Sequence, residues 1–178
     1  MTSIEPADPA SPTAQAVAGT LDSFGRLSDA SAVFPRILAR APGYADALWG
    51  AMAEALFEGG VDHGLKEIIR IQLATTAGDP YFAGIRSGPA ITAGLTEDRI
   101  EAALGDFEND PQFTDAEKWA LRYAYTMYRE PELIDAAFYD EGKRHFSEAQ
   151  IMEIGALIAV HYGMYVFMRT LQNDAEPA

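Results

Sequence analysis

Helical periodicity is the feature of this sequence that most constrains its fold. Between residues 15 and 173 apolar residues recur at three- and four-residue spacing, and no stretch of any length alternates like a strand. We therefore predict one all-α domain of about seven helices, a size that 178 residues with 48% hydrophobic residues can fill. Proline-rich residues 1–14 predict a disordered arm, and residues 174–178 predict a flexible tail.

Two predicted helices carry most of the polar residues of interest. Asp62 is a candidate N-cap for a helix over 63–77, which Gly78 would end. Ser147 opens the longest predicted helix, which is apolar on nearly every side from Ile154 to Met168. A helix of this kind is expected at the centre of the domain, or with one face in the core and another against a second subunit.

Charge and composition exclude several classes of function. The chain has no cysteine, which rules out disulfides, thiolate metal sites and thiol redox cycles. A formal net charge of −14 argues against nucleic acid and disfavours an anionic membrane as partners. We find no secretory signal and no run of about 20 consecutive apolar residues, so we expect a cytoplasmic protein that acts on a small molecule.

A polar stripe follows the helix predicted over 63–77. His63, Glu67 and Arg70 fall at i, i+4 and i+7 and so share one face, where Glu67 can pair with Arg70. A solvated face is the simpler interpretation of such a stripe, and a functional site is the alternative. His63 and Glu67 also have the spacing of two metal ligands on one helix, but the sequence offers no clear third ligand.

The stretch "DPYFAGIR" at 79–86 is the second candidate. Asp79 precedes a proline and is therefore biased towards extended backbone, and Tyr81 and Phe82 begin a helix. Arg86 lies just over one turn beyond Tyr81 and can face the same space. The competing interpretation is an ordinary helix start, with Asp79 as the N-cap, the proline at its first position and Arg86 on the surface.

His161 is the third candidate, because it interrupts the apolar run "ALIAVHYGMYVFM". A buried imidazole needs a hydrogen-bond partner, and Tyr165 lies one turn further along the same face. A core histidine satisfied by a hydrogen bond is the commoner outcome for a residue in this position.

Several segments together resemble the carboxymuconolactone decarboxylase and AhpD-like alkylhydroperoxidase superfamily. They are "VFPRILARAPGYADALW", "VDHGLKEIIRIQLATTAGDPYFAGIRSGPAITAGLTEDRIEAAL", "FTDAEKWALRYAYTMYREPELID" and "FSEAQIMEIGALIAVHYGMYVFMR". The likeness covers roughly residues 30–170 and lies in the order of these elements. It implies an AhpD-like helical bundle that forms dimers, trimers or hexamers.

The resemblance also implies that the redox apparatus of the peroxidase-like members has been replaced. Glu67 matches their glutamate, while Asp79 and Phe82 stand where the two cysteines are expected. Tyr81 and Arg86 take the positions of the two histidines. Thiol peroxidase and disulfide reductase activity are therefore excluded for this chain.

What the decarboxylase members imply is acid–base chemistry without a cofactor. We expect a lyase or isomerase that acts on a small carboxylated lactone, keto acid or enone, with a cation near the developing enolate and a group that returns a proton. The candidate catalytic residues are Glu67, Tyr81, Arg86 and His161, and the candidate substrate contacts are Arg70, Asp79, Phe82 and Tyr165.

Two alternatives stay open at this point. The first is a non-catalytic oligomer that lost the redox cysteines and serves as a ligand-binding protein or scaffold. The second is a metal-dependent site, with Glu67, Asp79 and either His63 or His161 as ligands.

Overall fold

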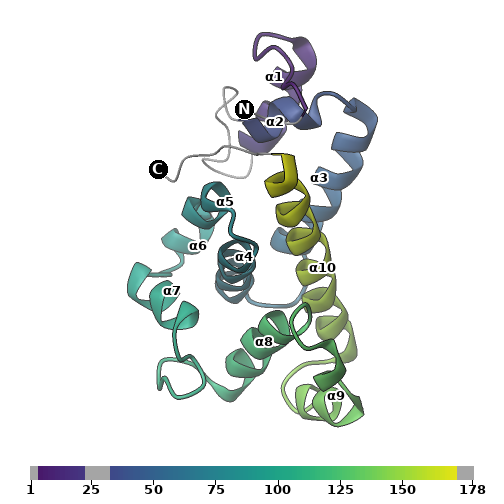
Figure 1. The fold of residues 1–178 in the computed structure, drawn as a ribbon. Coiled ribbons are helices and arrows are strands. Elements are labelled where there is room, and N and C mark those ends of the chain that lie inside the picture. The colour runs from purple at the N-terminus through teal and green to yellow at the C-terminus, as the bar shows by residue number, and fades with distance from the viewer. Residues whose placement is uncertain (1–3, 23–32, 172–178) are drawn as a thin grey trace.

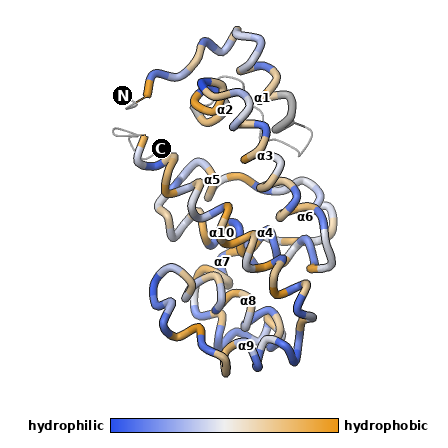
Figure 2. The backbone as a smooth tube through the Cα atoms, turned by 90° about the vertical axis from the view of Figure 1, so that its right-hand side faces the viewer, coloured by the Kyte–Doolittle hydropathy of each residue, from blue (hydrophilic) through white to orange (hydrophobic). Residues whose placement is uncertain are grey.

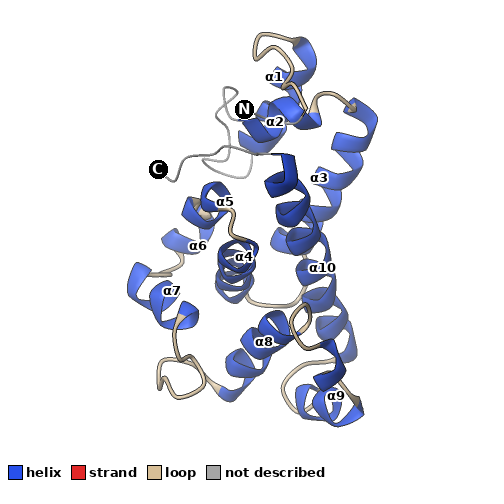
Figure 3. Ribbon diagram, in the orientation of Figure 1, coloured by secondary structure: helices blue, strands red, loops and turns tan. Residues whose placement is uncertain are grey.

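The computed structural model describes residues 4–22 and 33–171, and every regular element in these ranges is a helix (Figure 3). The predicted all-α fold is therefore confirmed. The helices, in chain order, are α1 (Pro12–Asp22), α2 (Val33–Leu38), α3 (Pro42–Phe57), α4 (His63–Ala77), α5 (Pro80–Gly84), α6 (Gly88–Thr92), α7 (Glu97–Leu104), α8 (Asp115–Thr126), the 3-10 helix η1 (Pro131–Leu133), α9 (Ala136–Gly142) and α10 (Glu148–Leu171).

Helix α4 forms the centre of the molecule. It is seen nearly end-on in Figure 1, with α5, α6 and α7 on one side, α10 on the other and α8 beside it. Asp62 caps it as predicted, because its Oδ1 accepts a hydrogen bond from the Leu65 backbone N–H at 2.9 Å. Gly78 ends it in the left-handed conformation at φ 67°, which glycine adopts without strain.

Helix α10 packs along α4 and α3 and supplies much of the core. Its buried residues include Ile154, Leu157 and Ile158, and Figure 2 shows hydrophobic residues along α10 and α4 in the middle of the fold. By length and composition alone, α10 could also cross a membrane. Its outer side leaves Met152 and Phe167 exposed, as the predicted contact with a second subunit would require, and that self-association stays a prediction.

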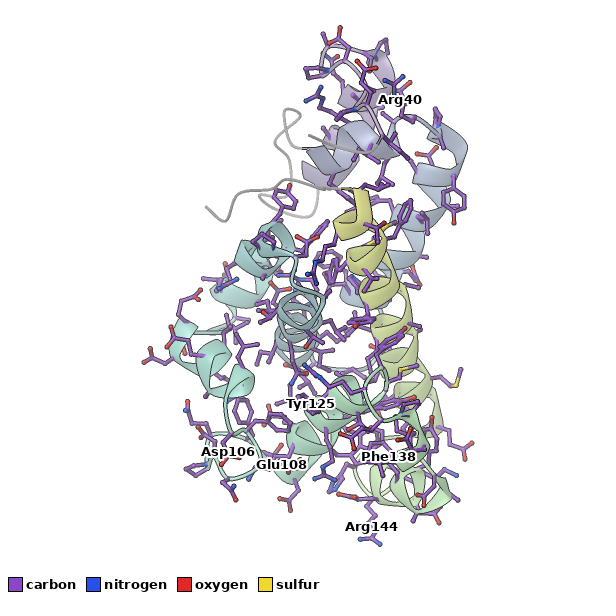
Figure 4. The ribbon with its side chains drawn as sticks, in the orientation of Figure 1. Arg40, Asp106, Glu108, Tyr125, Phe138 and Arg144 are labelled. Atoms are coloured by element: carbon purple, nitrogen blue, oxygen red, sulfur yellow. The ribbon has the colours of Figure 1, made fainter. Side chains whose placement is uncertain are left out.

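The described ranges contain more helices than the about seven predicted, for two reasons. The segment 80–92 becomes α5 and α6, since the backbone extends at Ile85 and Ser87. After α8 the chain adds η1 and α9, which no strong periodicity marks. Phe138 of α9, labelled in Figure 4, accepts a hydrogen bond from the Trp119 indole N–H at its carbonyl and so fixes α9 to α8.

The predicted disordered arm has contacts where the structure describes it. The backbone N–H of Ala7 donates to the Arg36 carbonyl, and the Arg36 Nε–H donates back to the Ala7 carbonyl at 2.7 Å. Arg40, labelled in Figure 4, donates to the Glu5 carbonyl in the same way. Residues 4–11 thus lie along α2, while residues 1–3 and the predicted tail at 174–178 lie outside the described ranges.

Candidate functional site

The polar stripe of α4 is buried, which corrects the simpler interpretation of a solvated face. Glu67 is 0% exposed and Arg70 is 4% exposed, because α5 and α6 cover this side of the helix. The two side chains form a two-point ion pair, with Arg70 Nε and Nη2 donating to the two Glu67 carboxylate oxygens at 2.7 and 2.9 Å. This pairing satisfies two charges that would otherwise be costly to bury.

The same stripe holds the backbone between α5 and α6. Arg70 donates from Nη1 to the Phe82 carbonyl and from Nη2 to the Ile85 carbonyl, each at 2.7 Å. Glu67 Oε1 accepts from the Ser87 backbone N–H at 2.7 Å. His63 Nε2 lies 2.7 Å from the Ser87 hydroxyl. The three residues therefore act together as a clamp on residues 82–87, which we call the α4 clamp.

Glu67 uses most of its hydrogen-bonding capacity within this arrangement. Its Oε1 accepts two hydrogen bonds and its Oε2 accepts one, all from donors fixed by α4 or by the α4 clamp. A carboxylate held in this way keeps its position. The geometry gives Glu67 the part of a positioning residue for Arg70, and its predicted role in proton transfer has no support from these contacts.

A narrow pocket lies beside the clamp, between α3, α4, α5 and α10. It contains about 280 Å³ of space free of protein atoms, some of it open to solvent, and admits the centre of a water molecule over only about 20 Å³. Most of its wall is apolar or aromatic, and three polar side chains face it. The lining residues are Trp49, Met52, Ala53, Leu56, Phe57, Arg70, Phe82, His161 and Tyr165.

His161 contributes a hydrogen-bond acceptor to this pocket. Its Nδ1 lies 3.0 Å from the Leu157 carbonyl, which can only accept, so Nδ1 carries the proton and Nε2 carries the lone pair. Burial lowers the pKa of His161 to about 3, and the positive charge of Arg70 lowers it as well. The imidazole is therefore neutral at physiological pH.

Tyr165 contributes a buried hydroxyl that makes no hydrogen bond of normal geometry with the described residues. It is 0% exposed, and its oxygen has no hydrogen bond of normal geometry within residues 4–22 and 33–171. Burial raises the pKa of Tyr165 to about 12, although the neighbouring Arg70 charge acts in the opposite direction. The hydroxyl is thus a proton donor at pH 7. An orphaned buried hydroxyl is costly, which is typical of a functional site.

Arg70 contributes one further donor. A guanidinium has five N–H groups, and Arg70 uses four of them on Glu67, Phe82 and Ile85. The remaining N–H, on Nη1, makes no hydrogen bond of normal geometry with the described residues, although Arg70 lies close enough to the Tyr165 hydroxyl for the two groups to interact. Although burial alone would lower the pKa of Arg70, the charge of Glu67 raises it, so the group is a permanent cation.

Three other predicted residues lie apart from the pocket lining. Asp79 is buried and caps α5 by accepting from the Phe82 N–H, and burial raises its pKa. Tyr81 is half-buried and packs edge-on against the Phe82 ring. Arg86 is at the surface in a two-point pair with Glu97 at 2.8 and 2.9 Å. The ordinary helix start predicted for this segment is therefore what the structure shows.

The metal alternative finds no suitable ligand set in the part of the chain that the structure describes. No three histidine, aspartate or glutamate side chains converge there. Both oxygens of Glu67 are occupied by Arg70, and His63 is bound to the Leu56 carbonyl and Ser87.

A second cavity is larger but less suited to chemistry. It contains about 550 Å³ of space free of protein atoms, some of it open to solvent, and lies by the N-terminus of α4, where Asp62, Arg99 and Glu117 are its charged residues. Arg99 and Glu117 bind each other at 2.5 Å, and Arg99 also donates to the Gln112 carbonyl. The Arg99 and Glu117 side chains in this cavity are already hydrogen-bonded and are partly exposed. The smaller pocket instead holds buried polar groups that can still form hydrogen bonds.

The neutral His161 predicts a pH dependence of stability. Because its pKa falls on folding, the unfolded chain binds a proton that the folded chain does not, and the free energy of unfolding should drop as the pH falls from about 6.5 towards 3. The slope from this group is up to about 1.4 kcal/mol per pH unit.

Urea denaturation at pH 7 and pH 5 measures this slope, and His161→Phe should remove it. The raised pKa of Asp79 acts oppositely, so the difference between the two proteins is the quantity to compare. Equal slopes in both would contradict a neutral, buried His161.

Sequence reasoning missed the α3 side of the pocket. Trp49, Met52, Leu56 and Phe57 line it, yet in the sequence they are only the apolar stripe of an amphipathic helix. Apolar residues at helical spacing indicate a buried face but give no information on which helix that face will contact. Only the packing of α3 against α10 brings these side chains to His161.

Known proteins resemble this chain in their three-dimensional structure but not closely in sequence. No protein-family model matches the sequence, and no curated protein matches it. Among solved structures, the apo form of the debrominase Bmp8 superposes with a TM-score of 0.79 at 21% identity, over 99% of this chain and 93% of that one. A cysteine-to-alanine variant of Bmp8 in complex with 2,3,4-tribromopyrrole gives 0.77 at 20% identity, over 99% and 92%.

A third similar structure is the AhpD core of an uncharacterized peroxidase-related protein from Ralstonia eutropha. It gives a TM-score of 0.68 at 13% identity, over 80% of this chain and 76% of that one. At these identities the likeness concerns the fold, and it confirms that this chain has the AhpD-like fold predicted from its sequence. The chain differs from the redox members of that fold in having no cysteine.

Proposed function

We propose that this protein is a cofactor-independent acid–base enzyme that moves a proton on a small, enolisable ring compound bound in the pocket between α3, α4, α5 and α10. The observation that carries the proposal is the convergence of an unsatisfied Tyr165 hydroxyl, the His161 Nε2 lone pair and a spare Arg70 N–H on one apolar pocket. Of the predicted reaction types, the isomerase fits this arrangement better than the decarboxylase.

The donors suit a developing enolate. A substrate carbonyl oxygen beside the Tyr165 hydroxyl and Arg70 would gain negative charge as a proton leaves the neighbouring carbon, and both groups stabilise that charge more than the neutral carbonyl. Because the pocket is buried, these interactions are stronger than they would be in water.

The acceptor suits the proton. His161 Nε2 faces the same pocket and is unprotonated, so it can receive a proton from the carbon and return it to another carbon. In the empty pocket burial and Arg70 hold its pKa at about 3, which is low for a base. A negative charge forming nearby favours the imidazolium, and proton transfer is therefore coupled to stabilisation of the enolate.

The neighbouring complex supports small-molecule binding in this fold. Bmp8 was solved with 2,3,4-tribromopyrrole, a single planar ring, and we propose a ligand of similar size and shape for this chain. Phe82 and Tyr165 pack against each other, with ring centroids 4.7 Å apart, and together form an aromatic wall that suits a flat ring.

Hydrogen–deuterium exchange tests the proposal without knowledge of the product. Cyclohex-2-enone, a small lactone and a small keto acid are incubated with the protein in D2O, and loss of the protons next to the carbonyl is followed by NMR. We expect exchange on the enone well above the rate in buffer alone. Exchange no faster than in buffer for all three compounds would contradict catalysis.

A non-catalytic ligand-binding protein is the second candidate, and one observation favours it. The α4 clamp fixes Glu67 and most of Arg70 in structural contacts, which leaves fewer mobile groups than acid–base chemistry commonly uses. This candidate predicts that a ring compound raises the melting temperature while no exchange is detected.

A further inference from the structure

The charges around the pocket cancel, and this bears on what can bind there. Arg70 is the only charged side chain in the lining, and its charge is balanced by the Glu67 carboxylate at 2.7 Å. His161 and Tyr165 are neutral at pH 7 because of their burial. The pocket therefore offers no net positive charge to an anion, and the chain as a whole carries −14.

The hydrogen-bonding capacity of the pocket is also specific. It includes two donors, the Tyr165 hydroxyl and the Nη1–H of Arg70, and the acceptor lone pair of His161 Nε2. The acceptor can be satisfied only by a ligand that brings a proton of its own. A carboxylate brings none, so it would place its lone pairs against that of His161.

A neutral hydroxyl on an unsaturated ring matches all three groups. Its oxygen accepts from Tyr165 or Arg70, and its proton is donated to His161 Nε2. The rest of the ring lies against Phe82 and the α3 side chains. Phenols and the enol forms of cyclic ketones share this chemistry, whereas aryl ethers lack the proton and benzoates carry a charge.

We infer that the pocket selects neutral ring compounds with an enolic or phenolic hydroxyl and rejects carboxylates. The inference rests on the proposed site and narrows its ligand class from the keto acids, carboxylated lactones and enones expected from the sequence. A phenol is a stable enol, so it should bind as an analogue of the intermediate in the proposed reaction.

Three probes of nearly equal size test the selectivity on the wild-type protein. Phenol has the hydroxyl, anisole has the same ring and oxygen without the proton, and benzoate carries the charge. We expect phenol, measured by NMR titration at pH 7, to bind at least about tenfold more tightly than either of the others. Benzoate or anisole binding as tightly as phenol would overturn the inference, and so would the absence of binding by phenol.

A variant locates the effect at His161. His161→Phe removes the acceptor, so phenol should lose its advantage over anisole. The exposed His145→Phe is the matched control and should leave the ratio unchanged. An unchanged phenol to anisole ratio in His161→Phe would overturn the assignment to His161, and the wild-type series stands even if this variant fails to fold.

The inference and the proposed reaction fail in different ways. Tight phenol binding without deuterium exchange would keep the selectivity and overturn catalysis. Exchange on a keto acid with preferential benzoate binding would keep catalysis and overturn the selectivity.

Discussion

Replacing Glu67 by alanine should lower the free energy of unfolding by about 3–5 kcal/mol, the cost of leaving one partner of a buried ion pair without the other. In this variant the Arg70 guanidinium stays buried without its counter-charge, and the Ser87 backbone N–H loses its acceptor. The α4 clamp would then no longer hold residues 82–87. Urea denaturation monitored by circular dichroism measures the change.

The matched control is the more exposed pair between Arg86, which lies between α5 and α6, and Glu97 at the start of α7. Glu97 is 57% exposed in its pair with Arg86, and Glu97→Ala should cost no more than about 1 kcal/mol. Replacing both clamp residues by apolar ones, in Glu67→Leu with Arg70→Met, should recover part of the loss because no charge is left unpaired. Glu67→Ala costing no more than Glu97→Ala would show that Glu67 is not clamped as described.

Replacing Tyr165 by phenylalanine should separate function from stability. Deuterium exchange on the enone should fall by about 100-fold or more, the usual contribution of one donor to a developing oxyanion. The free energy of unfolding should change by less than about 0.5 kcal/mol, because the hydroxyl has no hydrogen bond of normal geometry within the described residues.

Tyr123→Phe is the control for this prediction. The Tyr123 hydroxyl is bound to the Tyr139 hydroxyl at 3.1 Å, away from the pocket lining. Its removal should cost about 1 kcal/mol and leave exchange unchanged. If both tyrosine variants exchange at the wild-type rate, Tyr165 does not stabilise the enolate.

The helical architecture could be predicted because local signals agree with one another. Asp62, Gly78 and the apolar repeat of α10 are each read from a few neighbouring residues, and the structure confirms them. The sequence indicates a helix broken or kinked before Pro89 in residues 80–92, but it does not show where the backbone extends. That position depends on the α4 clamp, whose members lie up to 24 positions away from the residues they hold.

Four candidate residues lie together in the structure, whereas Arg86 lies apart from them. Arg70, His161, Tyr165 and Phe82 were candidates from their positions on the predicted helices and from the resemblance, and all four line one pocket. That this pocket is the functional site stays a prediction. Arg86 was placed there by helical spacing and by the resemblance, but the extended backbone at Ile85 turns its side chain to the surface and to Glu97.

A crystal structure of the protein grown with phenol tests the central claim most directly. We predict the ring between α3 and Phe82, with its oxygen within hydrogen-bond distance of His161 Nε2 and the Tyr165 hydroxyl. A ring bound only elsewhere, such as the larger cavity beside Arg99, would contradict the account.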